Sequence, residues 1–286
     1  MHFPVMLQES MEYLAIRPEG VYVDATAGLG GHTGEIARRL TTGFVISNDR
    51  DPEALEMAQR NTAEWAGRIR FHRGRFSDLR EALLQNGVEQ VDGLIGDFGV
   101  SRFQLTTAER GFSILADGPL DMRMDQSQGT TAADLVNYHA EKALADLFLE
   151  LGEERRARKL ARAIVRARPI RSTRHLADVV ERAAHRTGRL HPATQIFMAL
   201  RLAVNDEMGE LDRFFEIAPE LVRTQGRIVT ISFMSLEDRK AKEAFRNWGR
   251  EGRVTVLTKH PIGPSEQEVL INPASRSAKL RAVSMN

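Results

Sequence analysis

The sequence predicts an α/β protein in which a parallel sheet is interrupted by an all-helical insert. Three observations predict this class. Short apolar runs alternate with helical patterns through the first hundred residues, which is typical of βαβ units. Every periodic segment from Thr131 to about Val204 is helical. Strand-like runs then return from residue 227 onward.

Each element of the first part has its own signal. Apolar runs predict four strands, at Val21–Asp24, 44–47, 69–72 and 91–96. One helix is expected over 35–40, directly after a glycine-rich turn, and another over 51–65, with Pro52 in its first turn. Because the strands are short and apolar, we expect helices to cover both faces of the sheet.

The strand signal stops after Asp97. Residues 98–130 are rich in Gly, Asp, Arg and Ser, and three further strands are expected later, at 227–232, 254–257 and 279–284. Two sequential domains are an alternative, but four strands alone would leave a small sheet with exposed edges. We therefore predict one sheet domain in two parts, 1–105 and 206–286, with a helical insert over 106–205.

Composition excludes several classes of site. The chain contains no cysteine, which removes disulfides, thiolate zinc sites, iron–sulfur clusters and a cysteine nucleophile. The eight histidines show no ligand spacing such as His-x-x-x-His, so we expect no metal. No apolar run approaches the ~20 residues that span a bilayer, and the chain does not start with a basic region and an apolar signal core. We expect a soluble protein of the cytoplasm.

Charge is balanced overall, with 40 Lys and Arg against 39 Asp and Glu, but it is unevenly distributed. The stretch from Glu153 to Arg189 holds 12 basic and 4 acidic residues, and the rest holds 28 and 35. Two stripes run side by side at helical spacing, an apolar one and a basic one: Leu160, Ala161, Ile164 and Ala167, beside Arg155, Lys159, Arg162 and Arg166. This pattern favours a polyanion-binding surface over the alternative of a solvated helix face.

A glycine-rich turn follows the first strand, over Asp24 to His32. Such glycines let a ligand approach the backbone closely, although some turns of this kind only help packing. A dinucleotide fingerprint needs a third glycine where Thr33 stands, and the Gly-Lys-Ser/Thr of a phosphate-binding loop is absent. The turn therefore suits a nucleoside ligand without a pyrophosphate.

Polar side chains and an aromatic ring follow the next three strands. Asp49 stands 21 residues after Gly28, where a carboxylate can accept hydrogen bonds from both ribose hydroxyls. Asp51 already fills the helix N-cap position before Pro52, which leaves Asp49 for a ligand. Phe76 can pack on an adenine or belong to the core. Since Asp97 ends the fourth strand, all these residues share the edge where open α/β sheets bind ligands.

These motifs, with others further along the chain, resemble those of the small-subunit ribosomal RNA (cytosine-N4)-methyltransferase family, known as RsmH or MraW. The resemblance covers nearly the whole chain. The matching pieces are His2-x-Pro4-Val5, Asp24-x-Thr26-x-Gly28-x-Gly30-Gly31-His32, Asp49-Arg50-Asp51-Pro52, Asp97-x-Gly99-Val100-Ser101, Gln104-Leu105, Glu109-Arg110-Gly111-Phe112-Ser113, Gly118-Pro119-Leu120-Asp121-Met122-Arg123-Met124-Asp125, Gly152-Glu153-Glu154-Arg155, His191-Pro192-Ala193-Thr194, Val204-Asn205-x-Glu207 and Ser235-Leu236-Glu237-Asp238-Arg239.

The resemblance implies a Rossmann-like methyltransferase sheet that uses S-adenosylmethionine. It implies methylation at N4 of a cytosine in the decoding region of 16S ribosomal RNA in the small subunit, with the helical insert recognising RNA and no membrane partner. It leaves the oligomeric state open, with a dimer as one option. The residues implied to hold the cofactor are Gly30, Gly31, His32, Asp49, Phe76, Asp97 and Gln104.

Asp97 is the candidate catalytic residue. Methyl transfer to an exocyclic amine needs an acceptor that orients the amine and takes its proton, and Asp97 stands where donor and base must meet. The alternative is that Asp97 only orients the cofactor. Arg110, Arg123 and the basic stretch are candidates for phosphate contacts. The histidines 175, 185 and 191 are expected at the surface or facing RNA.

The chain departs from the family pattern beside the expected site. Arg102 and Phe103 replace the usual serine and proline, and Met234 replaces a histidine whose proton chemistry a thioether lacks. Two alternatives therefore stay open: a methyltransferase of the same fold acting on another RNA base or a protein, and a non-catalytic RNA-binding assembly factor. A NAD-dependent oxidoreductase is disfavoured by the missing third glycine.

Overall fold

The computed structural model describes residues 4–127, 129–184 and 191–286. The chain divides into two compact units, which are described separately below. The sheet unit consists of Met1–Gly99 and Met208–Asn286, and the helical unit of Val100–Glu207. The predicted insert, 106–205, lies within the second of these.

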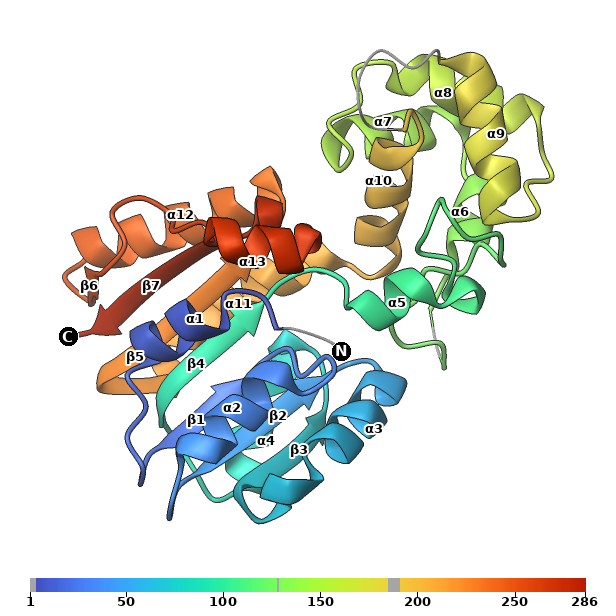
Figure 1. The fold of residues 1–286 in the computed structure, drawn as a ribbon. Coiled ribbons are helices and arrows are strands. Elements are labelled where there is room, and N and C mark those ends of the chain that lie inside the picture. The colour runs from blue at the N-terminus through green and yellow to red at the C-terminus, as the bar shows by residue number, and fades with distance from the viewer. Residues whose placement is uncertain (1–3, 128, 185–190) are drawn as a thin grey trace. The chain divides into compact units, whose positions relative to one another are not determined.

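Seven strands form one sheet in the order β3-β2-β1-β4-β5-β7-β6 (Figure 1). Their bounds are β1 Val21–Asp24, β2 Phe44–Asp49, β3 Ile69–Arg73, β4 Val91–Asp97, β5 Val222–Ser232, β6 Val254–Val256 and β7 Lys279–Met285. Strands β1 to β5 pair in parallel, so the carboxyl ends of β1, β2 and β4 meet at one edge. The parallel pairing expected from the βαβ units of the first hundred residues is confirmed, and β7 pairs antiparallel with β5 and β6 at one side of the sheet. Antiparallel strands at the side of a doubly wound sheet are common.

Helices flank the sheet as α1 Leu7–Leu14, α2 Gly31–Arg39, α3 Pro52–Asn61, α4 Leu79–Gln85, α11 Glu207–Leu221, α12 Ser235–Arg250 and α13 Glu266–Ile271, with 3-10 turns at Ala63–Arg68, Phe76–Asp78 and Pro273–Ser277. The helix expected over 51–65 is shorter than predicted. It ends at Asn61, where the Thr62 hydroxyl donates to the Ala58 carbonyl at 2.7 Å, and a 3-10 turn follows.

Alternate strand residues face two hydrophobic clusters, one on each side of the sheet. Val23 and Leu94 pack with side chains of α4, α11 and α12. Their neighbours Tyr22 and Ile95 pack with side chains of α1 and α2. Both faces of β4 are therefore buried, as the continuous apolar run predicted.

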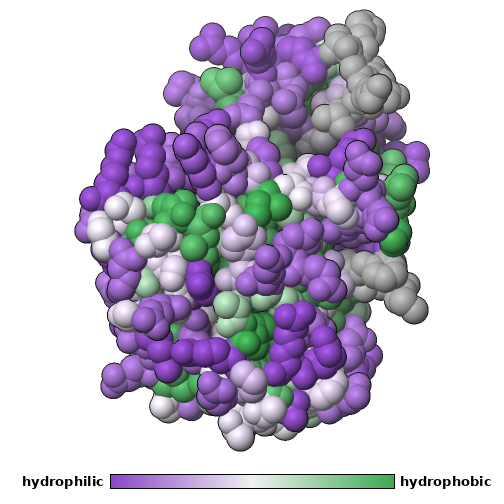
Figure 2. Space-filling view, turned by 60° about the vertical axis from the view of Figure 1, so that its left-hand side comes forward, coloured by the Kyte–Doolittle hydropathy of each residue, from purple (hydrophilic) through white to green (hydrophobic). Residues whose placement is uncertain are grey.

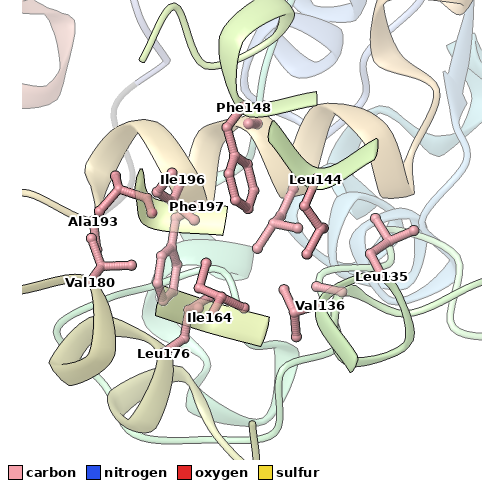
Figure 3. Packing of buried hydrophobic residues seen from close by; sticks show 14 of the residues in the cluster. Leu135, Val136, Leu144, Phe148, Ile164, Leu176, Val180, Ala193, Ile196 and Phe197 are labelled. Atoms are coloured by element: carbon pink, nitrogen blue, oxygen red, sulfur yellow. The ribbon is translucent and has the colours of Figure 1, made fainter. Parts of the chain in front are cut away.

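Within its described residues the helical unit contains helices and no strand. They are α5 Arg102–Thr106, α6 Ala132–Tyr138, α7 Glu141–Glu150, α8 Ala157–Arg166, α9 Thr173–Ala183 and α10 Thr194–Val204, with a 3-10 turn at Ala108–Arg110. Their apolar faces meet in one core, in which Phe148, Ile164 and Phe197 point toward one another (Figure 3).

The two stripes predicted on α8 are confirmed. Leu160, Ala161 and Ile164 are buried, and Ala167, at the end of the helix, is partly buried. The four basic residues of the neighbouring stripe are all exposed: Arg155, Lys159, Arg162 and Arg166. Packing on one side therefore leaves the basic side open to solvent.

The face drawn in Figure 2 is predominantly polar. In the view of Figure 2, hydrophilic side chains cover most of the face, and hydrophobic ones gather in small groups between them. Among the residues that the structure describes, no helix combines the length and the apolar character needed to cross a membrane.

Candidate functional site

The site begins at the end of β1, where Asp24 fixes the glycine-rich turn. This buried carboxylate accepts a hydrogen bond from the Thr26 backbone N–H at 3.1 Å and one from the Thr33 hydroxyl at 2.7 Å. The Thr33 hydroxyl in turn lies 2.7 Å from that of Ser47 on β2. Asp24 therefore holds the first turn of α2 against the sheet, which is a structural task.

The glycines of the turn are needed for different reasons. A Cβ on Gly30 would lie 2.8 Å from the Thr62 methyl carbon, and one on Gly31 would lie 2.7 Å from Cβ of Pro4. Gly28 has a φ of +51°, and a Cβ there would meet, within the described part of the chain, only the Thr26 carbonyl oxygen at 3.8 Å. Packing explains Gly30 and Gly31, whereas the space beside Gly28, called the cradle below, is open.

Asp49, at the end of β2, borders this cradle. Its carboxylate accepts hydrogen bonds from the backbone N–H groups of Gly28, at 2.9 Å, and Asp51, at 3.0 Å. Asp51 caps α3, as predicted, by accepting from Glu53 and Ala54. Burial raises the pKa of Asp49 to about 6, against the lowering effect of the two N–H donors. Each carboxylate oxygen still has a free lone pair, so Asp49 can accept further hydrogen bonds from hydroxyl groups.

Asp97, the last residue of β4, is partly buried, and the charges of other carboxylates act on it. Its backbone N–H donates to the Thr26 hydroxyl at 2.8 Å, which ties β4 to the turn. Its Oδ1 atom is buried and finds no hydrogen-bond partner within the described residues. Burial first, and then the charges of Asp24, Glu237 and Glu268, raise the pKa of Asp97 well above its ordinary value. An unpaired buried oxygen of this kind can accept a hydrogen bond from a bound molecule.

His32 lies beside Asp97 in the first turn of α2. Its Nε2 atom is 3.0 Å from the carbonyl oxygen of Val5, and its Nδ1 atom is 3.9 Å from Oδ2 of Asp97. Since a carbonyl only accepts, Nε2 carries the hydrogen and Nδ1 the lone pair. Burial lowers the pKa of His32 and keeps the ring neutral, although the charge of Asp24 acts in the opposite direction.

The remaining two predicted residues have defined structural roles. Phe76 is partly buried and packs edge-on against Phe98 and Phe214, with ring centroids 5.8 and 5.3 Å apart. It belongs to the edge of the core, and its adenine contact stays a prediction. Gln104 lies in the helical unit, where its amide oxygen accepts from the Ser101 N–H at 2.9 Å and completes a capping box on α5. The structure thus brings the glycines, His32, Asp49, Phe76 and Asp97 together in one unit, whereas Gln104 belongs to the other.

The full sequence, residues 1–286, matches the family model described as the MraW methylase family. The chain belongs to this family. It is 67% identical, over the full length of both chains, to the ribosomal RNA small subunit methyltransferase H of Solibacter usitatus. It is 50% identical to the protein of that name from Acidobacterium capsulatum, with 98% of this chain and 97% of that one covered.

The fold comparison agrees with this membership. A putative rRNA-methylase from Clostridium thermocellum matches all of both chains with a TM-score of 0.50 and 11% identity, which shows the fold alone. The resemblance to the MraW family and the Rossmann-like methyltransferase fold are confirmed. The family uses S-adenosylmethionine, so the predicted cofactor is confirmed as well.

Two arginines of the family motifs, which the sequence suggested as phosphate contacts, have partners within the helical unit. Arg110 is buried and donates to the carbonyl oxygens of Arg123, at 3.0 Å, and Met124, at 2.8 Å. Arg123 forms a two-bond ion pair with Asp121, at 2.9 and 2.8 Å. The prediction is wrong for Arg110, which is buried and bonded to carbonyl oxygens. For Arg123, whose side chain is partly exposed, a phosphate contact stays a prediction.

Other polar residues have local partners as well. His175 accepts the backbone N–H of Arg171 at 3.2 Å, and His191 accepts that of Ala193 at 3.1 Å. His185, like His2 of the first motif, lies outside the described residues. In the part of the chain that the structure describes, no three His, Asp or Glu side chains form a group that could hold a metal ion.

Sequence reasoning missed two carboxylates whose charges raise the pKa of Asp97. Glu237, in α12, is buried and accepts the backbone N–H groups of Phe233 and Met234, at 2.8 and 3.1 Å. A glutamate three residues after the N-cap position, here Met234, was its local signal. Glu268, in α13, accepts the Met6 N–H at 2.8 Å, and a partner 262 residues away leaves no local signal.

Proposed function

We propose that this protein methylates the RNA of the small ribosomal subunit in the cytoplasm, and that its target is N4 of a cytosine in the decoding region of 16S ribosomal RNA. Membership of the MraW family and the names of its relatives support the ribosomal substrate. The observation that carries the chemistry is the buried, unpartnered oxygen of Asp97 at the edge of the sheet.

The residues at this edge fit S-adenosylmethionine. The open cradle at Gly28 admits a ligand to the backbone, and Asp49 can accept hydrogen bonds from ribose hydroxyls. The partly exposed ring of Phe76 can pack on adenine. Gly30, Gly31, His32 and Gln104 complete the cofactor-binding set that we propose. When bound, the cofactor supplies a methyl group on a positively charged sulfur.

The chain itself must then orient the amine and receive its proton. The amine of cytosine is a weak nucleophile, because its lone pair is delocalised into the ring. We assign both tasks to Asp97, whose free Oδ1 atom can accept an N–H group. Because the pKa of Asp97 is raised, its carboxylate is a stronger base than an exposed one, and it takes a proton more readily as the reaction proceeds.

The target base must be presented outside any stack, so a splayed cytosine in structured RNA is the expected substrate. We assign the RNA contact to the exposed basic stripe of α8. Lys159 and Arg166 are exposed on α8, and Arg155 is exposed just before it. Contacts of this kind release counterions from phosphates, so binding should weaken steeply with salt.

The decisive experiment incubates the protein with radiolabelled S-adenosylmethionine and small subunits that lack the modification. Nuclease digestion then identifies the labelled nucleoside, and N4-methylcytidine is the expected product. Asp97→Asn is the matched variant, since it keeps the size of the side chain and loses the basic carboxylate. Label in another base or in protein would favour the same-fold alternative, and binding of subunits without label would favour an assembly factor.

A further inference from the structure

The chain before α1 crosses the glycine-rich turn and contacts it directly. Pro4 packs against Gly31, and the Val5 carbonyl oxygen accepts a hydrogen bond from Nε2 of His32 at 3.0 Å. Met6 has a left-handed backbone, with φ of +50°, which L-residues seldom adopt. Its side chain is fully buried, so packing holds the backbone in this conformation.

A residue from the far end of the sequence holds the same segment from the other side. Glu268 lies in α13, beside the start of α1 (Figure 1), and its carboxylate accepts the Met6 N–H at 2.8 Å. Ser265 caps the N-terminus of α13, because its hydroxyl accepts the Glu268 N–H at 3.1 Å. The carboxylate is thus placed by its own helix cap.

One peptide group connects these two contacts. The carbonyl of Val5 and the N–H of Met6 belong to the same planar amide, which accepts from His32 on one side and donates to Glu268 on the other. An amide whose N–H donates to a carboxylate is polarised, and its oxygen becomes a better acceptor. Glu268 therefore strengthens the hydrogen bond that orients the His32 ring.

We propose that Glu268 is a positioning residue of the methyl-transfer site, which acts through the Val5–Met6 peptide to hold hydrogen on Nε2 of His32 and to present Nδ1 as an acceptor beside Asp97. The distance of 3.9 Å from Nδ1 to Oδ2 of Asp97 is too long for a direct hydrogen bond. Two neighbouring acceptors fit a donor that carries several N–H groups. That donor is an amino group, either of the cofactor or of the target base, and in this respect the inference rests on the proposed function.

The first test reads the ring without any reaction. Long-range proton–nitrogen NMR of histidine-labelled protein distinguishes the two neutral tautomers, and His32→Asn identifies the signal. Wild-type protein should show hydrogen on Nε2 alone. Glu268→Ala and the longer Glu268→Met, which fills the same space, should both give a mixture of tautomers. Glu268→Gln keeps an acceptor for Met6 and should restore the wild-type signal.

Glu266→Ala is the matched control, because Glu266 is exposed on the same helix. It should leave the tautomer, cofactor affinity and turnover unchanged. A single tautomer on Nε2 in folded Glu268→Ala or Glu268→Met would overturn the proposal. The proposal would also be overturned if Glu266→Ala reduced the Nε2-hydrogen tautomer of His32 as much as Glu268→Ala does.

The second test identifies the donor. If the donor is the cofactor's amino group, Glu268→Ala should weaken calorimetric binding of S-adenosylhomocysteine by the factor by which the Nε2-hydrogen tautomer is depleted, about twofold for an equal mixture. If it is the amine of the base, this affinity should stay constant and kcat should fall instead. If the wild-type protein methylates no RNA while Glu268→Ala still shows both the tautomer change and the loss of affinity, the proposed function is contradicted and the role of Glu268 remains intact.

Discussion

Cofactor affinity should depend on pH through Asp49. Burial raises the pKa of this carboxyl to about 6, so it is mostly ionised at neutral pH and mostly protonated about one unit below that value. The protonated form loses an acceptor position and turns a donor toward hydroxyl groups that are themselves donors. Binding that needs the carboxylate should therefore weaken as the pH falls.

The pKa sets the size of this effect. With a pKa of about 6, the ionised fraction falls from roughly nine-tenths at about pH 7 to roughly one-tenth at about pH 5, so affinity should fall about tenfold. The assay is calorimetric titration of S-adenosylhomocysteine across this range, with circular dichroism to verify that the protein stays folded. Asp49→Asn should bind S-adenosylhomocysteine weakly at every pH, and its affinity should lack the pH dependence that Asp49 contributes.

Other groups near the turn also titrate, namely Asp97, Glu268 and His32. They are present in both proteins, so the difference between the wild-type and Asp49→Asn curves isolates Asp49. Equal slopes in the two proteins, or a flat wild-type curve, would refute the assignment of Asp49 to the ribose.

The same shift affects stability without ligand. Because the folded-state pKa of Asp49 is above the ordinary 3.8, the folded protein holds the proton more tightly than the unfolded chain does. The free energy of unfolding should therefore fall as the pH rises between these two values, by at most about 3 kcal/mol, and by less because Asp49 is partly exposed. Urea unfolding of the wild type and Asp49→Asn measures the difference.

Four further outcomes are expected. Asp97→Asn should lower turnover at saturating cofactor by at least about tenfold, and unchanged turnover would remove the catalytic assignment. Since a cationic ligand lowers the pKa of Asp97, binding of S-adenosylmethionine at a pH where Asp97 is partly protonated should release protons, detected as heats that differ between two buffers and do so less in Asp97→Asn. Gly28→Ala should cost only about 1 kcal/mol of stability for its left-handed backbone, yet weaken cofactor binding much more, which melting and calorimetry compare. Lys159→Ala with Arg166→Ala should reduce the slope of log affinity for RNA against log salt by roughly 1.5 and leave cofactor affinity unchanged; an unaltered slope would remove the basic stripe from the RNA interface.

Much of the sheet unit could be predicted because its signals are local. A strand such as β4, buried on both faces, must be a continuous apolar run, and Asp97 ends it because the chain there meets the open edge of the sheet. The cap of α3 follows equally from Asp51 and Pro52, two adjacent residues with known preferences. Local rules therefore placed Asp49 and Asp97 at one edge.

Contacts between distant segments could not be predicted in this way. The sequence shows Arg110 as a charge in a polar stretch, and only the fold shows that two carbonyl oxygens and the rings of Phe103 and Phe112 surround it. Glu268 is a similar case, because its partner Met6 is 262 residues away. Side-chain pairing over such separations depends on topology, which pattern and propensity do not contain.

Partly buried carboxylates of the sheet unit differ in the direction of their pKa shift, which depends on whether a basic side chain lies beside them. Asp238 in α12 is also partly shielded from solvent, and burial alone would raise its pKa, but Arg281 at 2.7 Å and Lys279 at 3.5 Å lower it. Asp49 and Asp97 have raised pKa values instead, and the described residues place no lysine or arginine in an ion pair with either one. A buried carboxylate without a basic partner destabilises the free protein. A ligand that brings positive charge or N–H donors offsets this cost when it binds. A positively charged methyl donor and an amine with N–H groups are ligands of that kind.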